Sequence, residues 1–238
     1  MDLSIVIPVF NEVECINPLL DEIGVCLVAE TGYEVIVVDD GSIDGTAAVL
    51  QAARQSHPRL RILHHRERSG QSAAIASGVK AAGTQWIATL DGDGQNDPAD
   101  ILKLYRIMDE SPDDVHMVAG YRRQRMDGYL RRLTSRIANS VRVAVLHDGS
   151  PDSACGLRIF ARATFLSLPQ FDHMHRFLPA LVQRQGGKVL SVEVNHRKRQ
   201  RGQSKYGIHN RLWVGIIDTL GVRWLQQRCK QPVVSEIE

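Results

Sequence analysis

Short apolar runs alternate with longer mixed segments through the first half of the chain. The runs span residues 5–7, 35–38, 60–63, 86–90 and 115–119, and each intervening segment is long enough for a helix. Parallel strands are buried on both faces and need crossover connections, so this alternation predicts an α/β fold with a mostly parallel sheet flanked by helices. We expect the first helix to begin at Asn11, with Glu14 completing a capping box, and the next two near Asp44 and Ser69.

Polar motifs directly follow three of these runs. They are Pro8-Val9-Phe10-Asn11-Glu12, Asp39-Asp40-Gly41-Ser42 and Asp91-Gly92-Asp93-Gly94-Gln95. Ligands of open parallel sheets collect beyond the carboxyl ends of the strands, so we expect the three loops to share one edge and form a site. The alternative for each is local: a solvated Asp/Gly turn, or a turn followed by a helix cap.

The third motif carries the oxygen ligands of a hard cation. Mg²⁺ and Mn²⁺ sites usually use one or two protein carboxylates and complete the shell with substrate phosphates and water. We therefore expect Asp91, Asp93 and Gln95 to bind Mg²⁺ or Mn²⁺ together with a nucleotide diphosphate. In the same site Asp39 or Asp40 would accept hydrogen bonds from the base or the ribose.

Charge is distributed unevenly along the 238 residues. The net charge is only +2, but residues 1–114 hold 8 Lys and Arg against 19 Asp and Glu, whereas residues 115–238 hold 21 against 8. This polarity suggests a cation-binding first half and a second half that faces anions. Neither a G-x-G-x-x-G after the first strand nor a G-x-x-x-x-G-K-[ST] occurs, which disfavours dinucleotide oxidoreductases and P-loop enzymes.

Cysteine use and the absence of targeting patterns suggest a cytoplasmic protein. Cys15, Cys26, Cys155 and Cys229 form no C-x-x-C pair and are interpreted as reduced thiols. The first residues do not resemble a signal peptide, and no run reaches the about 18 apolar residues expected of a membrane span.

Together the motifs resemble the family 2 glycosyltransferases, which have the GT-A fold. Residues 8–12 are similar to the family's P-x-Y-N-E, residues 38–46 to V-D-D-G-S-x-D-G-T, and residues 91–95 to D-x-D-x-Q. Two departures stand out: Phe10 replaces Tyr, and Arg68-Ser69-Gly70 replaces N-x-G. Three later motifs favour the group of dolichyl-phosphate mannosyltransferase and its undecaprenyl-phosphate relatives: Ser135-Arg136-Ile137-Ala138-Asn139, Cys155-Gly156-Leu157-Arg158 and Arg201-Gly202-Gln203-Ser204-Lys205-Tyr206.

The resemblance implies an inverting, metal-dependent enzyme that moves a sugar from GDP-mannose or a UDP-sugar to a polyprenyl phosphate. The glycosyltransferase domain would cover residues 1–210. The implied donor-binding residues are Pro8, Phe10, Asn11, Glu12, Asp39, Asp40, Gly41, Ser42, Gly70, Asp91, Gly92, Asp93, Arg201 and Lys205. The implied acceptor-phosphate residues are Arg122, Arg132, Ser135 and Arg136, and the candidates for catalysis are Asp93 and Asp152.

Two basic segments fit anionic substrates. Seven arginines and one acid lie between Gly120 and Arg142, and residues 197–211 hold six Lys and Arg and no acid. Arginine offers a carboxylate or phosphate two parallel hydrogen bonds. The alternative is a solvated basic surface or a nucleic-acid patch. Nucleic acid is disfavoured because Tyr206 is the only aromatic residue in the second segment, and base stacking needs more.

The carboxyl-terminal part, residues 211–238, is treated as a separate segment. Its stretch 212–225 is rich in bulky apolar residues, includes Trp213 and Trp224, and is flanked by basic residues. It is too short to span a bilayer and suits an amphipathic helix lying in the headgroup layer. We expect a peripheral protein on the cytoplasmic face of the membrane. The alternatives are an ordinary core helix or a dimer contact, which leaves a homo-oligomer or a membrane-protein partner open.

Two other functions remain in view. One is a family 2 transferase that acts on a glycan or protein hydroxyl, which would need a general base such as Asp152. The other is a non-catalytic sensor of sugar nucleotides or a membrane adaptor. The motifs identify neither the sugar nor the base.

Overall fold

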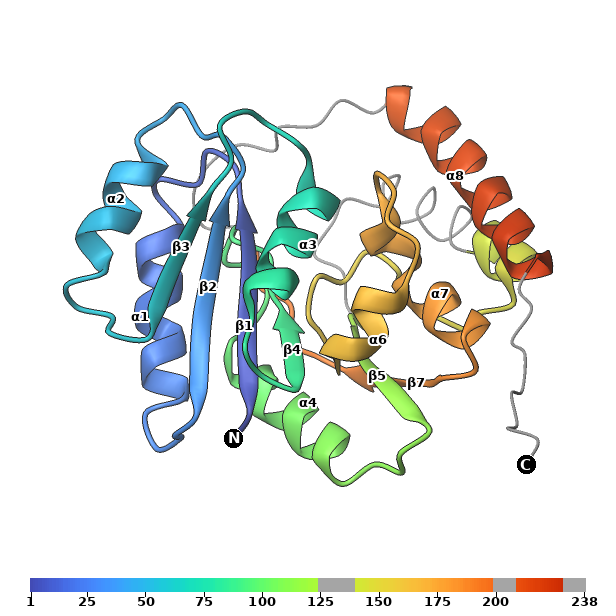
Figure 1. Ribbon diagram of the computed structural model, residues 1–238, viewed down its shortest axis with the longest axis horizontal. Helices are drawn as coiled ribbons and strands as arrows, with labels where there is room; N and C mark the ends of the chain where they lie inside the picture. The colour runs from blue at the N-terminus through green and yellow to red at the C-terminus, as the bar shows by residue number, and fades with distance from the viewer. Residues whose placement is uncertain (124–139, 199–208, 229–238) are drawn as a thin grey trace, which may run out of the picture.

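One sheet forms the centre of the protein in the computed structural model, which describes residues 1–123, 140–198 and 209–228. Within these residues the sheet order is β3-β2-β1-β4-β6-β5-β7 (Figure 1). The strands are β1 (Leu3–Val9), β2 (Tyr33–Asp39), β3 (Leu60–His64), β4 (Trp86–Thr89), β5 (Val115–Tyr121), β6 (Arg158–Ala161) and β7 (Lys188–Glu193). All neighbouring strands are parallel except β6, which runs antiparallel to both β4 and β5.

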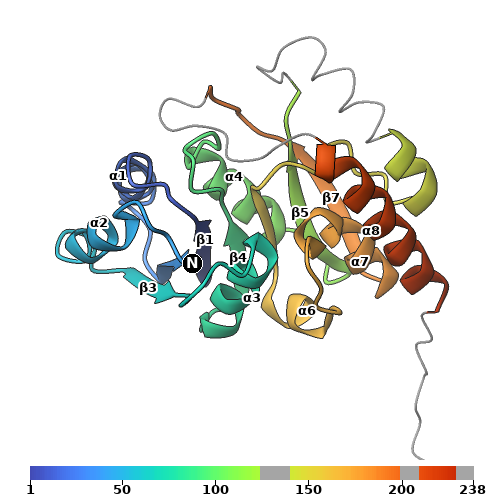
Figure 2. The same ribbon diagram turned by 90° about the horizontal axis from the view of Figure 1, so that it is seen from above.

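Helices cover both faces of this sheet. They are α1 (Ile16–Cys26), α2 (Thr46–Ala53), α3 (Gln71–Ala81), α4 (Ala99–Asp109), α6 (Arg162–Ser167), the 3₁₀ turn η1 (Met174–Phe177), α7 (Leu178–Arg184) and α8 (His209–Gln227), and residues 140–146 are also helical. Figure 2 shows α1 and α4 on one side of the sheet and α3 and α6 on the other. The predicted α/β architecture, with a mostly parallel sheet between helices, is confirmed.

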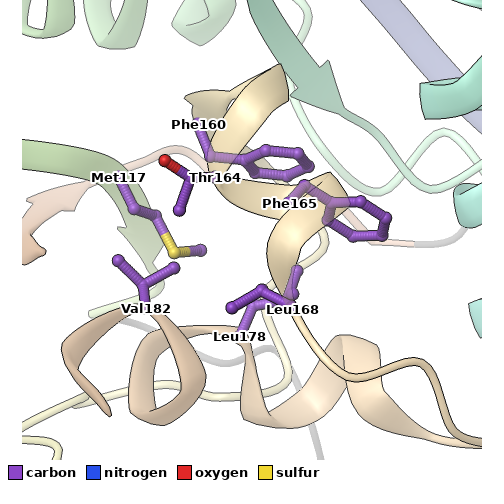
Figure 3. A pocket seen from close by; sticks show the side chains of 7 residues that line it. All are labelled: Met117, Phe160, Thr164, Phe165, Leu168, Leu178 and Val182. Carbon is purple, nitrogen blue, oxygen red and sulfur yellow. The ribbon is translucent and has the colours of Figure 1, made fainter. Parts of the chain in front are cut away.

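The alternation of side chains along each strand divides the core into two clusters. Ile5 and Ile7 of β1 pack with α1, α2 and α4, while Val6 packs with α3, α6, α7 and Val222 of α8. Successive residues of a strand point to opposite faces, so these apolar strands need helices on both sides. A crevice in the second cluster is too narrow to admit a water molecule (Figure 3); it is lined by Met117, Phe160, Thr164, Phe165, Leu168, Leu178 and Val182.

The five predicted strands are all present, but the predicted start of the first helix is wrong. Helix α1 begins at Ile16, and Cys15 at its N-cap makes no side-chain capping bond. Asn11 instead adopts a left-handed backbone with φ of 54°. Its side-chain oxygen accepts a hydrogen bond from the Ile43 N–H at 2.8 Å, so the residue joins two loops rather than capping a helix. Asp44 lies near the start of α2, as expected, and accepts from the Thr46 N–H.

Candidate active site

The loops after β1 and β2 are tied together at the carboxyl edge of the sheet. The Asn11 N–H donates to the Ser42 hydroxyl at 2.8 Å, and the Glu12 N–H donates to the Thr46 hydroxyl at 2.9 Å. Sheet pairing places Val9 opposite Asp39, so the two loops leave the sheet side by side. The predicted donor-binding residues of both loops therefore lie at one edge.

Asp39 and Asp40 are both buried and each holds a loop. Asp39 accepts from the Ser42 N–H at 3.0 Å and lies 3.1 Å from His64 Nδ1. Asp40 accepts from the N–H groups of Ser69 and Gly70, each at 2.8 Å, and so fixes the loop that leads into α3. These bonds explain where the carboxylates sit, and contact of either one with a nucleoside stays a prediction.

Close approach of two loops explains Gly41. Its φ is +73°, and a Cβ there would lie 2.8 Å from the backbone nitrogen of Arg68. Glycine is the residue that accepts both the left-handed conformation and the contact. The Asp39–Ser42 turn thus packs directly on the loop before α3.

Asp91 and Asp93 follow β4 at the same edge. Burial, followed by the negative charge of Asp93, raises the pKa of Asp91 to about 6, while the positive charges of Arg158 and Arg122 oppose the rise. A carboxylate whose proton is held by burial and by a second carboxylate nearby offers, with that neighbour, oxygen ligands suited to a divalent cation. The backbone oxygen of Gln95 accepts from the Arg197 N–H at 2.9 Å, which anchors the end of this loop.

Three neighbours of Asp91 were given no role by the sequence analysis. Gln71, the first residue of α3, donates from its side-chain amide to Asp91 Oδ1 at 3.0 Å. Gly156 lies so close to Asp91 that a Cβ at residue 156 would collide with the carboxylate. Arg158 is buried at the start of β6. Gly156 and Arg158 belong to a motif that resembles the family pattern, but the motif alone does not predict that either residue lies near Asp91.

Arg122 and Asp152, predicted separately for the acceptor phosphate and for catalysis, form one ion pair. Arg122 Nε donates to Asp152 Oδ2 at 2.6 Å, and its terminal Nη2 donates to Oδ1 at 3.0 Å. Asp152 is buried, and the side chain of Arg122 keeps 14% of its surface exposed. The carboxylate is therefore committed to orienting the guanidinium. Burial lowers the pKa of Arg122, but hydrogen bonding and the charge of Asp152 act in the opposite direction, and the pKa is raised.

A second buried ion pair lies on the same loop. Arg142 contacts Asp148, and its guanidinium also donates to the Ser150 carbonyl oxygen at 3.2 Å. The two pairs hold residues 122 and 142 to the loop 148–152 beside the candidate site. Arg132, Ser135, Arg136, Arg201 and Lys205, which the sequence analysis assigned to the acceptor and donor, lie outside the described residues.

His175 links η1 to the first turn of α3. The Ser72 hydroxyl accepts from the His175 N–H at 3.2 Å and lies 2.7 Å from Nδ1 of the same residue. Burial and then the charge of Arg176 lower the pKa of His175 well below its usual value, so the ring is neutral at physiological pH.

In the described residues no three His, Cys, Asp or Glu side chains converge on one point. Asp91 and Asp93 are thus a pair that would need ligand oxygens to complete a shell. This is how Mg²⁺ and Mn²⁺ usually bind beside substrate phosphates.

The fold and the acid-bearing sheet edge define a glycosyltransferase with the GT-A fold. The family described as "Glycosyl transferase family 2" matches residues 4–167. The chain belongs to this family.

Two groups of relatives are polyprenyl-phosphate sugar transferases. The chain is 33% identical over 240 residues to a dodecaprenyl-phosphate galacturonate synthase of Rhizobium johnstonii, covering 98% of this chain and 69% of the relative. It is 34% identical over 208 residues to an undecaprenyl-phosphate 4-deoxy-4-formamido-L-arabinose transferase of Proteus mirabilis, covering 86% of this chain and 62% of the relative. The chain thus spans under two thirds of the length of the second relative.

Solved structures support the fold. A mannosyl-3-phosphoglycerate synthase from Rubrobacter xylanophilus aligns with 100% of this chain and 79% of its own, with a TM-score of 0.75 and 18% identity. A glucosyl-3-phosphoglycerate synthase from Mycobacterium tuberculosis, crystallised with Mn²⁺, UDP and glucosyl-3-phosphoglycerate, covers 93% of this chain and 79% of its own, with a TM-score of 0.71 and 19% identity. At these identities the likeness shows the fold alone.

Proposed function

We propose that this protein is an inverting, metal-dependent glycosyltransferase that moves a sugar from GDP-mannose or a UDP-sugar to a polyprenyl phosphate. One observation carries the proposal: Arg158 of β6 lies opposite both Thr89 of β4 and Ala119 of β5, so Asp91 and Arg122, the candidate for the acceptor phosphate, follow their strands at the same edge of the sheet. A donor diphosphate bound at the acidic pair and an acceptor phosphate bound at the arginine would therefore meet. The acceptor class is supported by the names of the relatives.

The donor end of the site belongs to the first half of the chain. The loops 8–12 and 39–42 would hold the nucleoside. Asp91 and Asp93, with Gln95 as a third candidate, would bind Mg²⁺ or Mn²⁺, which when present supplies a Lewis acid toward the departing diphosphate. Solved structures of the same fold contain Mn²⁺ or Mg²⁺ with UDP, in support of this assignment.

The acceptor needs orientation more than it needs a base. A phosphate monoester has a second pKa near 6 and is largely a dianion at neutral pH, so it can attack the sugar carbon without losing a proton first. The Arg122–Asp152 pair fits this chemistry, because the carboxylate orients the guanidinium and does not act as a general base. This favours a phosphate acceptor over a hydroxyl acceptor.

Helix α8 suits a position on a membrane surface. Four apolar side chains are exposed along it at helical spacing, namely Ile216 (43%), Ile217 (67%), Leu220 (60%) and Trp224 (57%). These four residues are called the α8 stripe. Among the described helices none is long and apolar enough to cross a bilayer. We infer that the α8 stripe lies in the headgroup layer of the cytoplasmic leaflet, where a polyprenyl phosphate would be reached.

The body of the protein holds α8 from its other side. Asp218 pairs with His173 at 3.2 Å, Val222 is buried, and the Gln226 amide donates to the Leu146 carbonyl at 3.0 Å. The α8 stripe is therefore presented by a helix fixed to the half of the fold that carries Arg122. The division at residue 210 between the catalytic domain and this segment is part of the proposal.

A transfer assay tests the function. The protein is incubated with Mn²⁺, undecaprenyl phosphate and a panel of radiolabelled donors that includes GDP-mannose and UDP-galacturonate. We expect a lipid-linked product from one donor, loss of product with EDTA or in Asp91→Asn, and an inverted anomeric centre by NMR. Label that passes only to a glycan or protein hydroxyl would overturn the proposed acceptor. Nucleotide binding without any transfer would indicate the sensor or adaptor.

A further inference from the structure

Three residues, one from α3 and two from the segment that enters β6, act on Asp91. The Gln71 amide donates to Oδ1, the backbone of Gly156 lies against the carboxylate, and the charge of the buried Arg158 acts on it. Asp93 Oδ1 accepts from the Gln95 N–H at 3.1 Å within its own loop.

Gln71 is placed by the same loop that Asp40 fixes. The N–H groups of Ser69 and Gly70 both donate to Asp40, and Gln71 begins α3 immediately afterwards. The next residue, Ser72, is bound to His175 of η1. With both neighbours fixed, the Gln71 side chain reaches Asp91 from a rigid base, and its amide can select one orientation of the carboxylate.

Strand β6 and the residues just before it bring the other two residues. It pairs antiparallel with β4, with Arg158 opposite Thr89, and the Thr89 hydroxyl donates to the Gly156 carbonyl at 2.7 Å. This bond holds the backbone of residue 156 beside the start of the Asp91 loop. The missing Cβ of Gly156 leaves the space that the carboxylate fills.

Arg158 is a buried cation that donates hydrogen bonds to two backbone carbonyl oxygens. Its guanidinium donates to the Ser153 carbonyl at 2.6 Å and to the His175 carbonyl. Burying a guanidinium costs several kcal/mol unless nearby anions and hydrogen bonds offset the cost. Desolvation lowers the pKa of Arg158, and the charges of Asp91 and Asp152 act in the opposite direction. Its two bonds join η1 to the segment that leads into β6, and so fix the backbone on either side of the Gly156–Arg158 stretch.

We propose that Gln71 and Arg158 are positioning residues of the cation site: Gln71 selects the orientation of the Asp91 carboxylate, and Arg158, through its bonds to the Ser153 and His175 carbonyls, holds the segment that places Gly156 against this carboxylate. The inference rests on the proposed function, because it assigns roles around the same Asp91. Partners behind a metal ligand typically change metal affinity or activity by about 10–100-fold when they are removed.

Mn²⁺ binding provides a readout that does not depend on turnover. Electron paramagnetic resonance counts free Mn²⁺ while the protein is titrated in the presence of UDP, and again in the presence of GDP. We expect Gln71→Leu and Arg158→Met each to weaken Mn²⁺ binding by about 10-fold or more. Arg158→Lys keeps the charge but not the forked geometry, and should bind Mn²⁺ with an affinity between the wild type and Arg158→Met.

Two matched variants control for the loss of a similar side chain elsewhere. Arg162 also donates to two backbone carbonyls, those of Val79 and Lys80, but at the start of α6. Gln51 is an exposed glutamine of α2. Arg162→Met and Gln51→Leu should keep the Mn²⁺ affinity of the wild type. If Arg158→Met does not fold, Gln71→Leu alone decides, because its partner and its helix remain in place.

The outcomes separate the two proposals. If the wild type binds Mn²⁺ with nucleotide and Gln71→Leu binds it equally well, the inference is overturned while the proposed function stands. If the wild type binds no Mn²⁺ with either nucleotide, both the metal-dependent function and the inference are overturned. Weakened Mn²⁺ binding in the Gln71 and Arg158 variants, at an unchanged circular dichroism spectrum and with unchanged controls, supports the inference.

Discussion

The guanidinium of Arg68 lies over the ring of Phe10, with its Cζ 4.3 Å from the ring centroid. Each of these residues departs from the family pattern. The family has a tyrosine at the position of Phe10, and it has N-x-G where this chain has Arg68-Ser69-Gly70. The two departures are therefore neighbours in the fold. Their contact joins the loop after β1 to the loop before α3, at the edge where the nucleoside is expected.

A double-mutant cycle would measure this contact. An exposed cation over an aromatic ring contributes about 0.5–1 kcal/mol, so we expect Phe10→Leu and Arg68→Met to show a coupling of this size in the free energy of unfolding. Arg59 over Tyr33, at 4.2 Å, is the matched control pair. Both cycles should give similar coupling, but only the Phe10 and Arg68 variants should weaken UDP or GDP binding by calorimetry. Equal nucleotide affinity in all variants would remove both residues from the donor site.

Cation binding should weaken as the pH falls through about 6, the raised pKa of Asp91. The folded protein holds this proton more tightly than the unfolded chain. The stability of the cation-free protein therefore falls as the pH rises from the ordinary pKa of aspartate to about 6. A divalent cation competes with the proton for Asp91. It therefore stabilises the folded state most at a pH above about 6, where Asp91 is already ionised. The rise in Tm on adding Mn²⁺ and UDP should therefore be larger at about pH 7.5 than at about pH 5.

Two controls accompany the pH series. The association of Mn²⁺ with UDP in buffer alone, measured at each pH, corrects for protonation of the nucleotide. Asp91→Asn should show little rise in Tm at either pH. A rise in the wild type that is the same at both pH values after the correction would contradict the assignment of Asp91 as a ligand.

The sheet edge could be predicted from the sequence because its determinants are local. The buried strands are apolar runs that end at Asp, Asn and Gly, and the parallel arrangement puts these ends together. Strands β6 and β7 were missed. Strand β6 begins with an arginine and runs directly into helix α6, and β7 is an edge strand with mixed polar and apolar residues, so neither shows the pattern of a separate buried strand.

The missed site residues depend on contacts between segments that are distant in the sequence, which no local pattern encodes. Gln71 and Asp91 are 20 residues apart, and their bond exists because Asp40 fixes the loop before α3. Arg158 reaches the site because β6 inserts antiparallel between β4 and β5. The capping box expected at Asn11 failed for the same reason: the spacing was right, but the loop after β2 offered the side chain another partner.

The missing side chain of Gly156 should be essential for cation binding. A Cβ at this position would collide with the Asp91 carboxylate, so Gly156→Ala should displace it and weaken Mn²⁺ binding by about 10-fold or more. Gly83→Ala is the matched control, because a Cβ there meets nothing within 4 Å. Mn²⁺ titrations followed by electron paramagnetic resonance would test both. Wild-type affinity in Gly156→Ala would show that Asp91 does not need its described position.

Asp152 should act through Arg122 and not as a base. In Asp152→Asn we expect the KM for polyprenyl phosphate to rise, while nucleotide binding and the pH dependence of kcat stay unchanged. Asp148→Asn breaks the other buried pair of the same loop and should lower Tm without the same rise in KM. A general base contributes about 10²–10⁴-fold, so a loss of kcat of that size with normal donor binding would favour a hydroxyl acceptor.

The α8 stripe should determine binding to membranes. Leu220→Glu and Trp224→Glu replace exposed apolar side chains with charged ones, which should disfavour insertion into the headgroup layer and reduce flotation with anionic liposomes. Val28→Glu is the control: Val28 is 80% exposed just after α1, at the opposite end of the fold from α8 (Figure 1). Flotation is measured by centrifugation and Tm by calorimetry, and Tm should change little because the replaced side chains already face solvent. Equal flotation of the stripe variants and the wild type would place the membrane contact elsewhere, and a stripe variant that turns a dimer into a monomer would identify α8 as a subunit contact.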